Sequence, residues 1–185
     1  SQPGSAMAAD TTRGTEATEG WTAEFDAETG TMTISGTGAC DLAATPEQSE
    51  SVTKMVVAEG ITSIYFHGFK NISQVSLPNT LTEIKDNSFE NCEKLTEIDI
   101  PQSVTKIGDY AFSTCNSLGK VVLHEGLKTI SISAFYQCEV LKEITIPQSV
   151  EQIGNYAFAQ CYALTEIEIP SKVKIINPST FEGCK

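Results

Sequence analysis

Phenylalanine recurs every 23 residues in the second half of this chain, and a cysteine follows each of these phenylalanines by three positions. The phenylalanines are Phe89, Phe112, Phe135, Phe158 and Phe181, and the cysteines are Cys92, Cys115, Cys138, Cys161 and Cys184. Leucine, isoleucine and valine hold further constant places in the same repeat. A period of roughly 20–30 residues with apolar residues at constant offsets is typical of a solenoid, whose coils stack and bury each other's apolar side chains. The sequence therefore predicts a stacked array.

A single repeat indicates how each coil is built. Ile98 and Ile100 alternate with acidic residues, which predicts a short strand whose isoleucines point inward. A second extended piece is expected over residues 104–107, and the spacing of three within residues 110–115 predicts one turn of α or 3₁₀ helix. One column of the repeat is uniformly small, as close contact between neighbouring coils requires. Its members are Ser88, Ala111, Ala134, Ala157 and Thr180. The expected fold class is a β-rich α/β solenoid.

The chain divides into three parts by its pattern. Residues 1–20 are small and polar, and their lack of apolar surface predicts a disordered leader or linker. Residues 21–58 begin with apolar residues that alternate around a turn at 26–30, which predicts a β-hairpin. Because an array must cover the apolar cross-section of its first coil, we expect 21–58 to be an N-terminal β cap. Within it, residues 41–51 are expected to form an acidic polar loop.

Residues 59–185 are expected to hold the repeats, of which the first is shortened to 20 residues. The step from Ile61 to Leu81 is 20 rather than 23. We expect the shortening to remove the helical turn. Either Phe66 or Phe69 could occupy the phenylalanine position of this repeat, and the alignment of its glycine favours Phe69.

Six cysteines would ordinarily suggest a disulfide framework. Five of them form one column here, with side chains that point in parallel directions about 4.8 Å apart. A disulfide also needs converging Cβ atoms and a torsion near about 90°, so we expect buried free thiols that pack as small apolar groups. Cys40 lies outside the column and is expected to be a buried cap residue, with a reactive thiol as the alternative.

The columns together (L-x-x-I-x-I-P-x-x-V-x-x-I-G-x-x-A-F-x-x-C) resemble the BspA-like class of leucine-rich repeats over residues 61–185. This resemblance implies a right-handed leucine-rich-repeat superhelix. It also implies a cell-surface or extracellular protein whose signal peptide has been removed, since similar proteins are typically surface-exposed or secreted by bacteria and several are adhesins. The sequence departs from the pattern at His124 in place of proline, at 69–71 where the cysteine step should lie, and at 177–178 in place of Gly-x.

Charge and motifs exclude several classes of function. The formal net charge is −12, which argues against nucleic acid and against docking on anionic lipid. No apolar run approaches the roughly 20 residues that span a bilayer. The chain lacks the catalytic motifs G-x-S-x-G, H-E-x-x-H and the P-loop, and it lacks C-x-x-C. We therefore expect no enzyme, cofactor or metal site, and no ligand or base role for His67 or His124.

The outward residues of the first strand form two columns on one face, the surface that such arrays usually present to partners. The expected partner-binding residues are Gln74, Glu97, Asp99, Lys120, Val122, Glu143, Thr145, Glu166 and Glu168. Their carboxylates form a loosely acidic strip that suits a basic partner, and Lys120 lies between carboxylates as in an ion ladder. The alternative is a solvated sheet face without a partner.

Five tyrosines are a second candidate for an interface, because tyrosine is enriched at binding surfaces. They are Tyr65, Tyr110, Tyr136, Tyr156 and Tyr162. The alternative is that they pack sideways on the adjacent coil.

The function predicted from these observations is a non-enzymatic interaction or adhesion module. It would bind a host or neighbouring-cell protein, or a glycan, through the open solenoid face. The alternative is a structural spacer that presents another domain. The last coil also lacks an evident cap, so end-to-end self-association through it is a further expectation.

Overall fold

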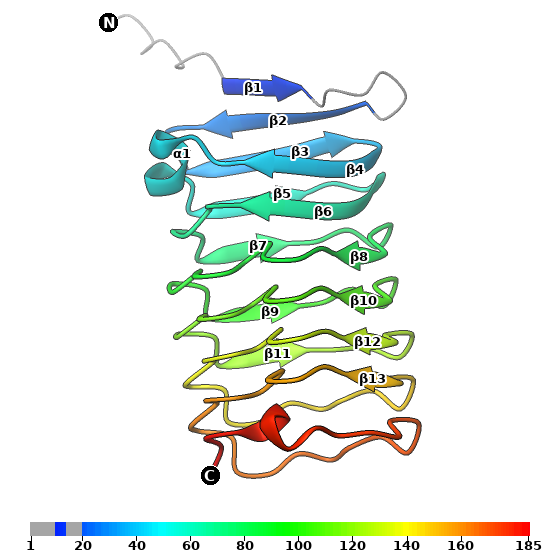
Figure 1. Ribbon diagram of the computed structural model, residues 1–185. Helices are drawn as coiled ribbons and strands as arrows, with labels where there is room; N and C mark the ends of the chain where they lie inside the picture. The colour runs from blue at the N-terminus through cyan, green and yellow to red at the C-terminus, as the bar shows by residue number, and fades with distance from the viewer. Residues whose placement is uncertain (1–9, 14–19) are drawn as a thin grey trace, which may run out of the picture.

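The computed structural model describes residues 10–13 and 20–185, with side chains from residue 20 onward. Its elements, in chain order, are β1 (Asp10–Arg13), β2 (Trp21–Asp26), β3 (Thr31–Gly36), β4 (Gly38–Ala43), α1 (Pro46–Ser51), β5 (Lys54–Val57), β6 (Ile61–His67), β7 (Gln74–Ser76), β8 (Glu83–Ile84), β9 (Glu97–Asp99), β10 (Lys106–Ile107), β11 (Lys120–Val122), β12 (Thr129–Ile130), β13 (Gln152–Ile153) and the 3₁₀ helix η1 (Pro178–Phe181). Figure 1 shows these elements as coils stacked in chain order from one end of the molecule to the other.

Strands of successive coils pair side by side and form three sheets in the described part of the chain. One sheet has the order β1-β2-β3-β5-β7, a second has the order β13-β12-β10-β8-β6-β4, and β9 pairs with β11. From β3 and β4 onward the pairing is parallel and joins residues of successive coils, as in Lys106 with Thr129 and Glu97 with Lys120. Each column of the repeat is therefore a continuous row, which confirms the predicted solenoid.

The phenylalanines form a ladder through the core. Ring centroids lie 5.2 Å apart for Phe89 and Phe112, 5.3 Å for Phe112 and Phe135, 5.5 Å for Phe135 and Phe158, and 5.7 Å for Phe158 and Phe181. The rings of each pair are within 15° of parallel. The predicted inward residues Ile98 and Ile100 are buried as well. Burial of these rows against one another is the main source of stability.

The expected helical turn over residues 110–115 is wrong. Tyr110 and Thr114 have left-handed backbones, with φ of 57° and 60°. Their N–H groups, and that of Phe112, donate to carbonyls of the next coil, while the intervening N–H groups donate within the turn. A helix would direct every N–H along its own axis and leave the neighbouring coil without these bonds. Among the described residues helix is limited to α1 and η1, so the fold is a β-solenoid rather than an α/β one.

The N-terminal hairpin is present. Strands β2 and β3 pair antiparallel from Trp21 with Gly36 to Asp26 with Thr31. Residues 10–13 differ from the expected linker, because they form β1 and pair antiparallel with β2. Two threonines favour an extended backbone here, and β2 would otherwise present an unpaired edge. The rest of the leader, 1–9 and 14–19, lies outside the described residues.

Residues 38–58 form a coil rather than part of a separate cap. Strand β4 pairs in parallel with β6, and β5 pairs in parallel with β7. The expected loop over 41–51 is wrong, because α1 occupies its second half. Thr45 caps α1 by accepting from the N–H of Gln48, and the Gln48 side chain accepts from the N–H of Thr45. The T-P-E-Q sequence is the signature of this capping box. The strand pairing therefore has no break at the expected boundary after residue 58.

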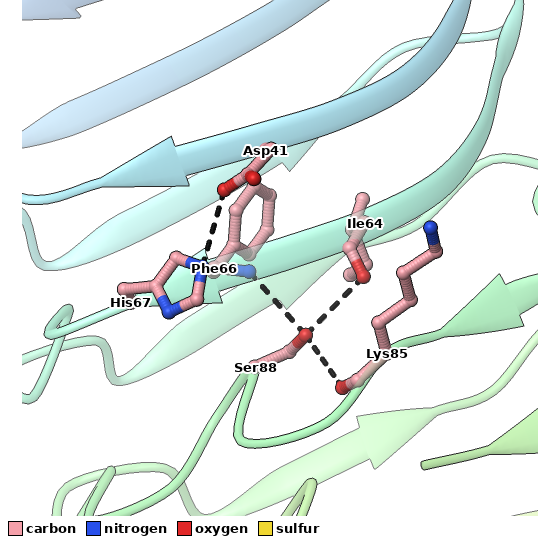
Figure 2. A network of polar contacts seen from close by, with 6 residues as sticks. All are labelled: Asp41, Ile64, Phe66, His67, Lys85 and Ser88. Atoms are coloured by element: carbon pink, nitrogen blue, oxygen red, sulfur yellow. Dashed lines mark hydrogen bonds and ion pairs between the residues drawn. The ribbon is translucent and has the colours of Figure 1, made fainter.

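The short repeat runs straight through β6, as expected from its missing turn. Its strands pair with the next coil at an offset of 20, as in Ile64 with Ile84. Ser88 stands where the next three coils have alanine, and Figure 2 shows its hydroxyl among three backbone groups. It accepts from the N–H of Phe66 at 3.3 Å and lies 2.8 Å from the carbonyl oxygen of Lys85. An unpaired N–H at this buried place would cost about 1–3 kcal/mol.

The position of Phe69 follows from the cysteine column. The Cys92 thiol donates to the carbonyl of Phe69 just as the Cys115 thiol donates to that of Phe89. The backbone of Phe69 therefore takes the phenylalanine place, as expected. The ring that meets Phe89 is nevertheless that of Phe66, edge-on at 5.9 Å.

Candidate functional site

The predicted partner-binding residues lie on the outer side of the strands that run from β7 to β11 and of the two coils that follow; we call these nine residues the open face. Gln74 lies on β7, Glu97 and Asp99 lie on β9, and Lys120 and Val122 lie on β11. The parallel register places Glu97 beside Lys120 and Asp99 beside Val122. The other four, Glu143, Thr145, Glu166 and Glu168, are exposed in the next two coils.

A hollow of about 280 Å³ interrupts the open face at β9 and β11. Glu97, Asp99, Lys120 and Val122 line it, together with Val75 and Ile98. The hollow combines carboxylates, one ammonium group and valine side chains in one place. Val75 was not among the predicted residues, although its place between Gln74 and Ser76 on β7 was a signal in the sequence.

The expected ion ladder through Lys120 is wrong, because no ion pair among residues 20–185 involves this lysine. Asp99 is instead paired with His124, whose Nε2 lies 2.7 Å from Oδ1. His67 and Asp41 form an equivalent pair at 3.1 Å (Figure 2). Each histidine therefore contacts a carboxylate of the preceding coil. Exposed pairs of this kind contribute about 0–1 kcal/mol.

The tyrosines fall into two groups. Tyr110, Tyr156 and Tyr162 are 41%, 43% and 44% exposed. Tyr65 and Tyr136 are half-buried, and the ring of Tyr65 lies 4.0 Å from that of His67. The ring contact of Tyr65 lies within β6, whereas the three exposed tyrosines stay candidates for an interface.

The cysteines are free thiols, as predicted. Each thiol of the column lies 3.1–3.4 Å from the carbonyl oxygen of a phenylalanine in the preceding coil. Burial raises the pKa of Cys40, Cys92 and Cys161 to about 12, and it raises the pKa of Cys115 and Cys138 well above the ordinary value. Cys184 is less buried, and burial raises its pKa as well. Among residues 20–185 no three His, Cys, Asp or Glu side chains are grouped to hold a metal ion.

Alkylation should separate Cys184 from the other thiols. Iodoacetamide reacts with the thiolate, so at mildly alkaline pH the native protein should be labelled mainly at Cys184, and the five buried cysteines should react only after unfolding in urea. Peptide mass spectrometry identifies the labelled positions. Rapid labelling of Cys115 or Cys138 in the native protein would contradict the packing of the thiol column.

Glu125 has a perturbed carboxyl group with a structural cause. It accepts hydrogen bonds from the backbone N–H of Gln148 at 2.9 Å and of Ser149 at 3.0 Å, both in the next coil. The bond from Gln148 is the main reason that its pKa is lowered. The Ser149 hydroxyl in turn accepts from the N–H of Gly126. The arrangement joins two coils.

A second hollow, which the sequence analysis did not predict, lies over β10, β12, β13 and the turns that follow them. It has a volume of about 590 Å³. Its walls include Ile132 and Ile175, two exposed aliphatic side chains in columns that are otherwise mostly polar. An aliphatic residue in a polar column is a signal that the sequence already contained.

The repeats match a known family model. A model of the BspA type leucine rich repeat region, in six copies, covers residues 48–185. The chain belongs to the BspA-type leucine-rich repeat family. The match begins within α1, which agrees with the coil formed by residues 38–58.

Solved structures of other bacterial proteins have a similar fold. The pneumococcal vaccine antigen PcpA has a TM-score of 0.61 at 18% identity, over 89% of this chain and 51% of that one. A Bacteroides ovatus leucine-rich repeat protein has a TM-score of 0.54 at 23% identity, over 83% and 52%. A leucine rich cell surface protein of Faecalibacterium prausnitzii has a TM-score of 0.50 at 22% identity, over 84% and 54%. The chain thus spans about half the length of these three. No curated protein matches it.

The helices in the described part of this BspA-type chain are short. None has the length and apolar character required to cross a membrane.

Proposed function

We propose that the chain is a non-enzymatic recognition module of a bacterial cell-surface or secreted protein. It binds a host or neighbouring-cell protein, or a glycan, through the open face. Family membership supports an interaction role, and the Faecalibacterium prausnitzii neighbour described as a cell surface protein supports the location.

The hollow at β9 and β11 is the observation that carries this proposal. Four of its six lining residues belong to the open face, and rigid parallel strands hold them. The open face has five carboxylates against the single ammonium group of Lys120. Such an imbalance favours a basic partner and speeds encounter at low salt. The partner expected here is a protein with a basic patch, or a glycan that carries amino groups.

Charge reversal tests the open face. The variant Glu97→Lys, Glu143→Lys, Glu166→Lys is compared with a control, Glu28→Lys, Glu93→Lys, Glu182→Lys, which has the same net charge and changes exposed residues outside the face. Both are applied with the wild type to arrays of immobilised extracellular matrix proteins and glycans. Binding that the wild type shows at low salt should fall about tenfold or more in the first variant and persist in the control.

Equal binding by the two variants would contradict a role for the open face. The spacer alternative predicts that the wild type binds nothing on either array and that both variants keep their fold. Thermal unfolding of all three proteins establishes that the substitutions act on binding.

The two ends of the stack have separate proposed roles. The hairpin buries Trp21, Met32 and Ile34 in the common core, which supports its role as the N-terminal cap. At the other end Ile176 is 37% exposed, whereas its column is 0–7% exposed in Ile84, Ile107, Ile130 and Ile153. End-to-end association through this coil stays a proposal, which sedimentation velocity over a range of protein concentrations tests.

A further inference from the structure

The hollow over β10, β12 and β13 is an elongated trough with a small-residue floor. Gly108, Ser131 and Gly154 occupy one column of the repeat between two columns of larger residues. A Cβ atom on Gly154 would lie 2.6 Å from the carbonyl carbon of Ser131 and closer still to the backbone nitrogen of Ile132. The coils therefore meet backbone to backbone along this column, and the surface sinks there.

The trough runs along the axis of the stack. One wall is a column of strand residues, made up of Lys106, Thr129, Gln152 and Ile175. The other wall is a column of turn residues, made up of Asp109, Ile132 and Asn155. At about 4.8 Å for each coil, the four coils from Lys106 to Ile175 span about 14 Å. An extended polypeptide rises about 3.3 Å per residue, so about four residues of such a segment fit.

Three side chains in the trough depart from their columns. Ile132 is 43% exposed where the adjacent coils have aspartate or asparagine, and Ile175 is 82% exposed where its column otherwise has polar or charged residues. Ser131 replaces the glycine of the adjacent coils and is 8% exposed. Ser131 lines the trough, and a serine hydroxyl can both donate and accept a hydrogen bond.

The charges and the lining chemistry indicate the kind of occupant. Lys106, Lys174, Asp109 and Glu151 line the trough, so its lining has equal numbers of positive and negative side chains. The trough is balanced in charge, unlike the acidic open face. Among the described residues, none that lines it is aromatic, so this part of the surface offers no flat apolar ring on which sugars stack.

We propose that the trough binds an extended, uncharged segment of a partner protein. An aliphatic side chain of the segment packs against Ile132 and Ile175, and its backbone bonds to the Ser131 hydroxyl and the neighbouring amide side chains. This site lies apart from the open face and does not depend on the function proposed for it.

Peptide display tests the trough. A library of random seven-residue peptides is selected on the full chain, and the affinity of enriched peptides is measured by fluorescence polarisation. Ile132→Asp and Ile175→Asp should each raise the Kd about tenfold or more. Val140→Asp is the matched control, because Val140 is aliphatic and 44% exposed and lies outside the trough; it should change the Kd less than about twofold.

The outcomes separate the proposal from its alternatives. Peptides that share an aliphatic residue and lose affinity in both trough variants support it. Failure to enrich any peptide would overturn it, as would enriched peptides that bind Ile132→Asp and Ile175→Asp as well as wild type. Glycan binding abolished by the same two substitutions would also overturn it. The charge-reversed open-face variant should keep peptide binding, and thermal midpoints confirm that each variant is folded.

Discussion

Replacing Phe135 with alanine should lower the free energy of unfolding by about 3–5 kcal/mol. The ring is fully buried and stacks on Phe112 and Phe158 at 5.3 and 5.5 Å. Its removal leaves a cavity in the middle of the ladder and breaks contacts to both neighbouring coils. Because coils in such arrays depend on their nearest neighbours, unfolding should also become less cooperative. Urea titration followed by circular dichroism measures both effects.

Phe181→Ala is the matched control. This ring is only half-buried, and its ring contact is with Phe158 at 5.7 Å. Phe181→Ala should therefore lower the free energy of unfolding clearly less than Phe135→Ala does. Similar losses at the two positions would show that stacking on both sides does not account for the stability of the ladder.

Gly60→Ala should destabilise the protein by about 2–6 kcal/mol, the sum of backbone strain and steric overlap. Gly60 has a φ of 108°, which residues with a side chain rarely adopt. An added Cβ would also overlap the carbonyl oxygen of Gly36, in the coil before it. The overlap would push apart coils that the bond from the Gly38 N–H to the Gly60 carbonyl holds at 3.0 Å.

Gly68→Ala separates strain from overlap. Gly68 has a φ of 79°, but the nearest atom to an added Cβ would be the Cβ of Ala44, 3.8 Å away. The Gly68→Ala variant should therefore be destabilised by backbone strain alone, which costs about 1–3 kcal/mol. Differential scanning calorimetry of both variants gives the comparison. A loss at Gly60 no greater than the loss at Gly68 would mean that the two coils do not approach closely there.

The rows of the core could be predicted because residues at equal offsets meet in successive coils. Phe112 contacts Phe89 and Phe135, so a repeated apolar letter is also a repeated contact. The thiols are buried for the same reason. The hairpin at β2 and β3 was also predictable, since alternation and turn chemistry are local signals.

The turns were not predictable from spacing. Tyr110 and Thr114 are not residues that favour a left-handed backbone, and a spacing of three suits a helix equally well. Their conformation depends on N–H groups that bond to the next coil, and a partner 22 residues away is not a local signal. Strand β1 depends in the same way on the open edge of β2.

For the candidate site, the outward direction of Glu97, Asp99 and Lys120 followed from alternation, but their interactions did not. Lys120 forms no ion pair with the neighbouring carboxylates in the described chain, whereas Asp99 pairs with His124. Side-chain pairing depends on reach and rotamer rather than on the column alone. The trough depends on how closely the backbones approach at Gly154.

Periodicity alone determined that this chain stacks into coils and which side chains lie inside them, because a repeat with constant apolar offsets has one efficient way to bury its surface. The tertiary structure decided the path of each turn, the place where the array begins and the shape of the two hollows. These features depend on hydrogen bonds and close contacts between coils, which exist only once the coils are in register.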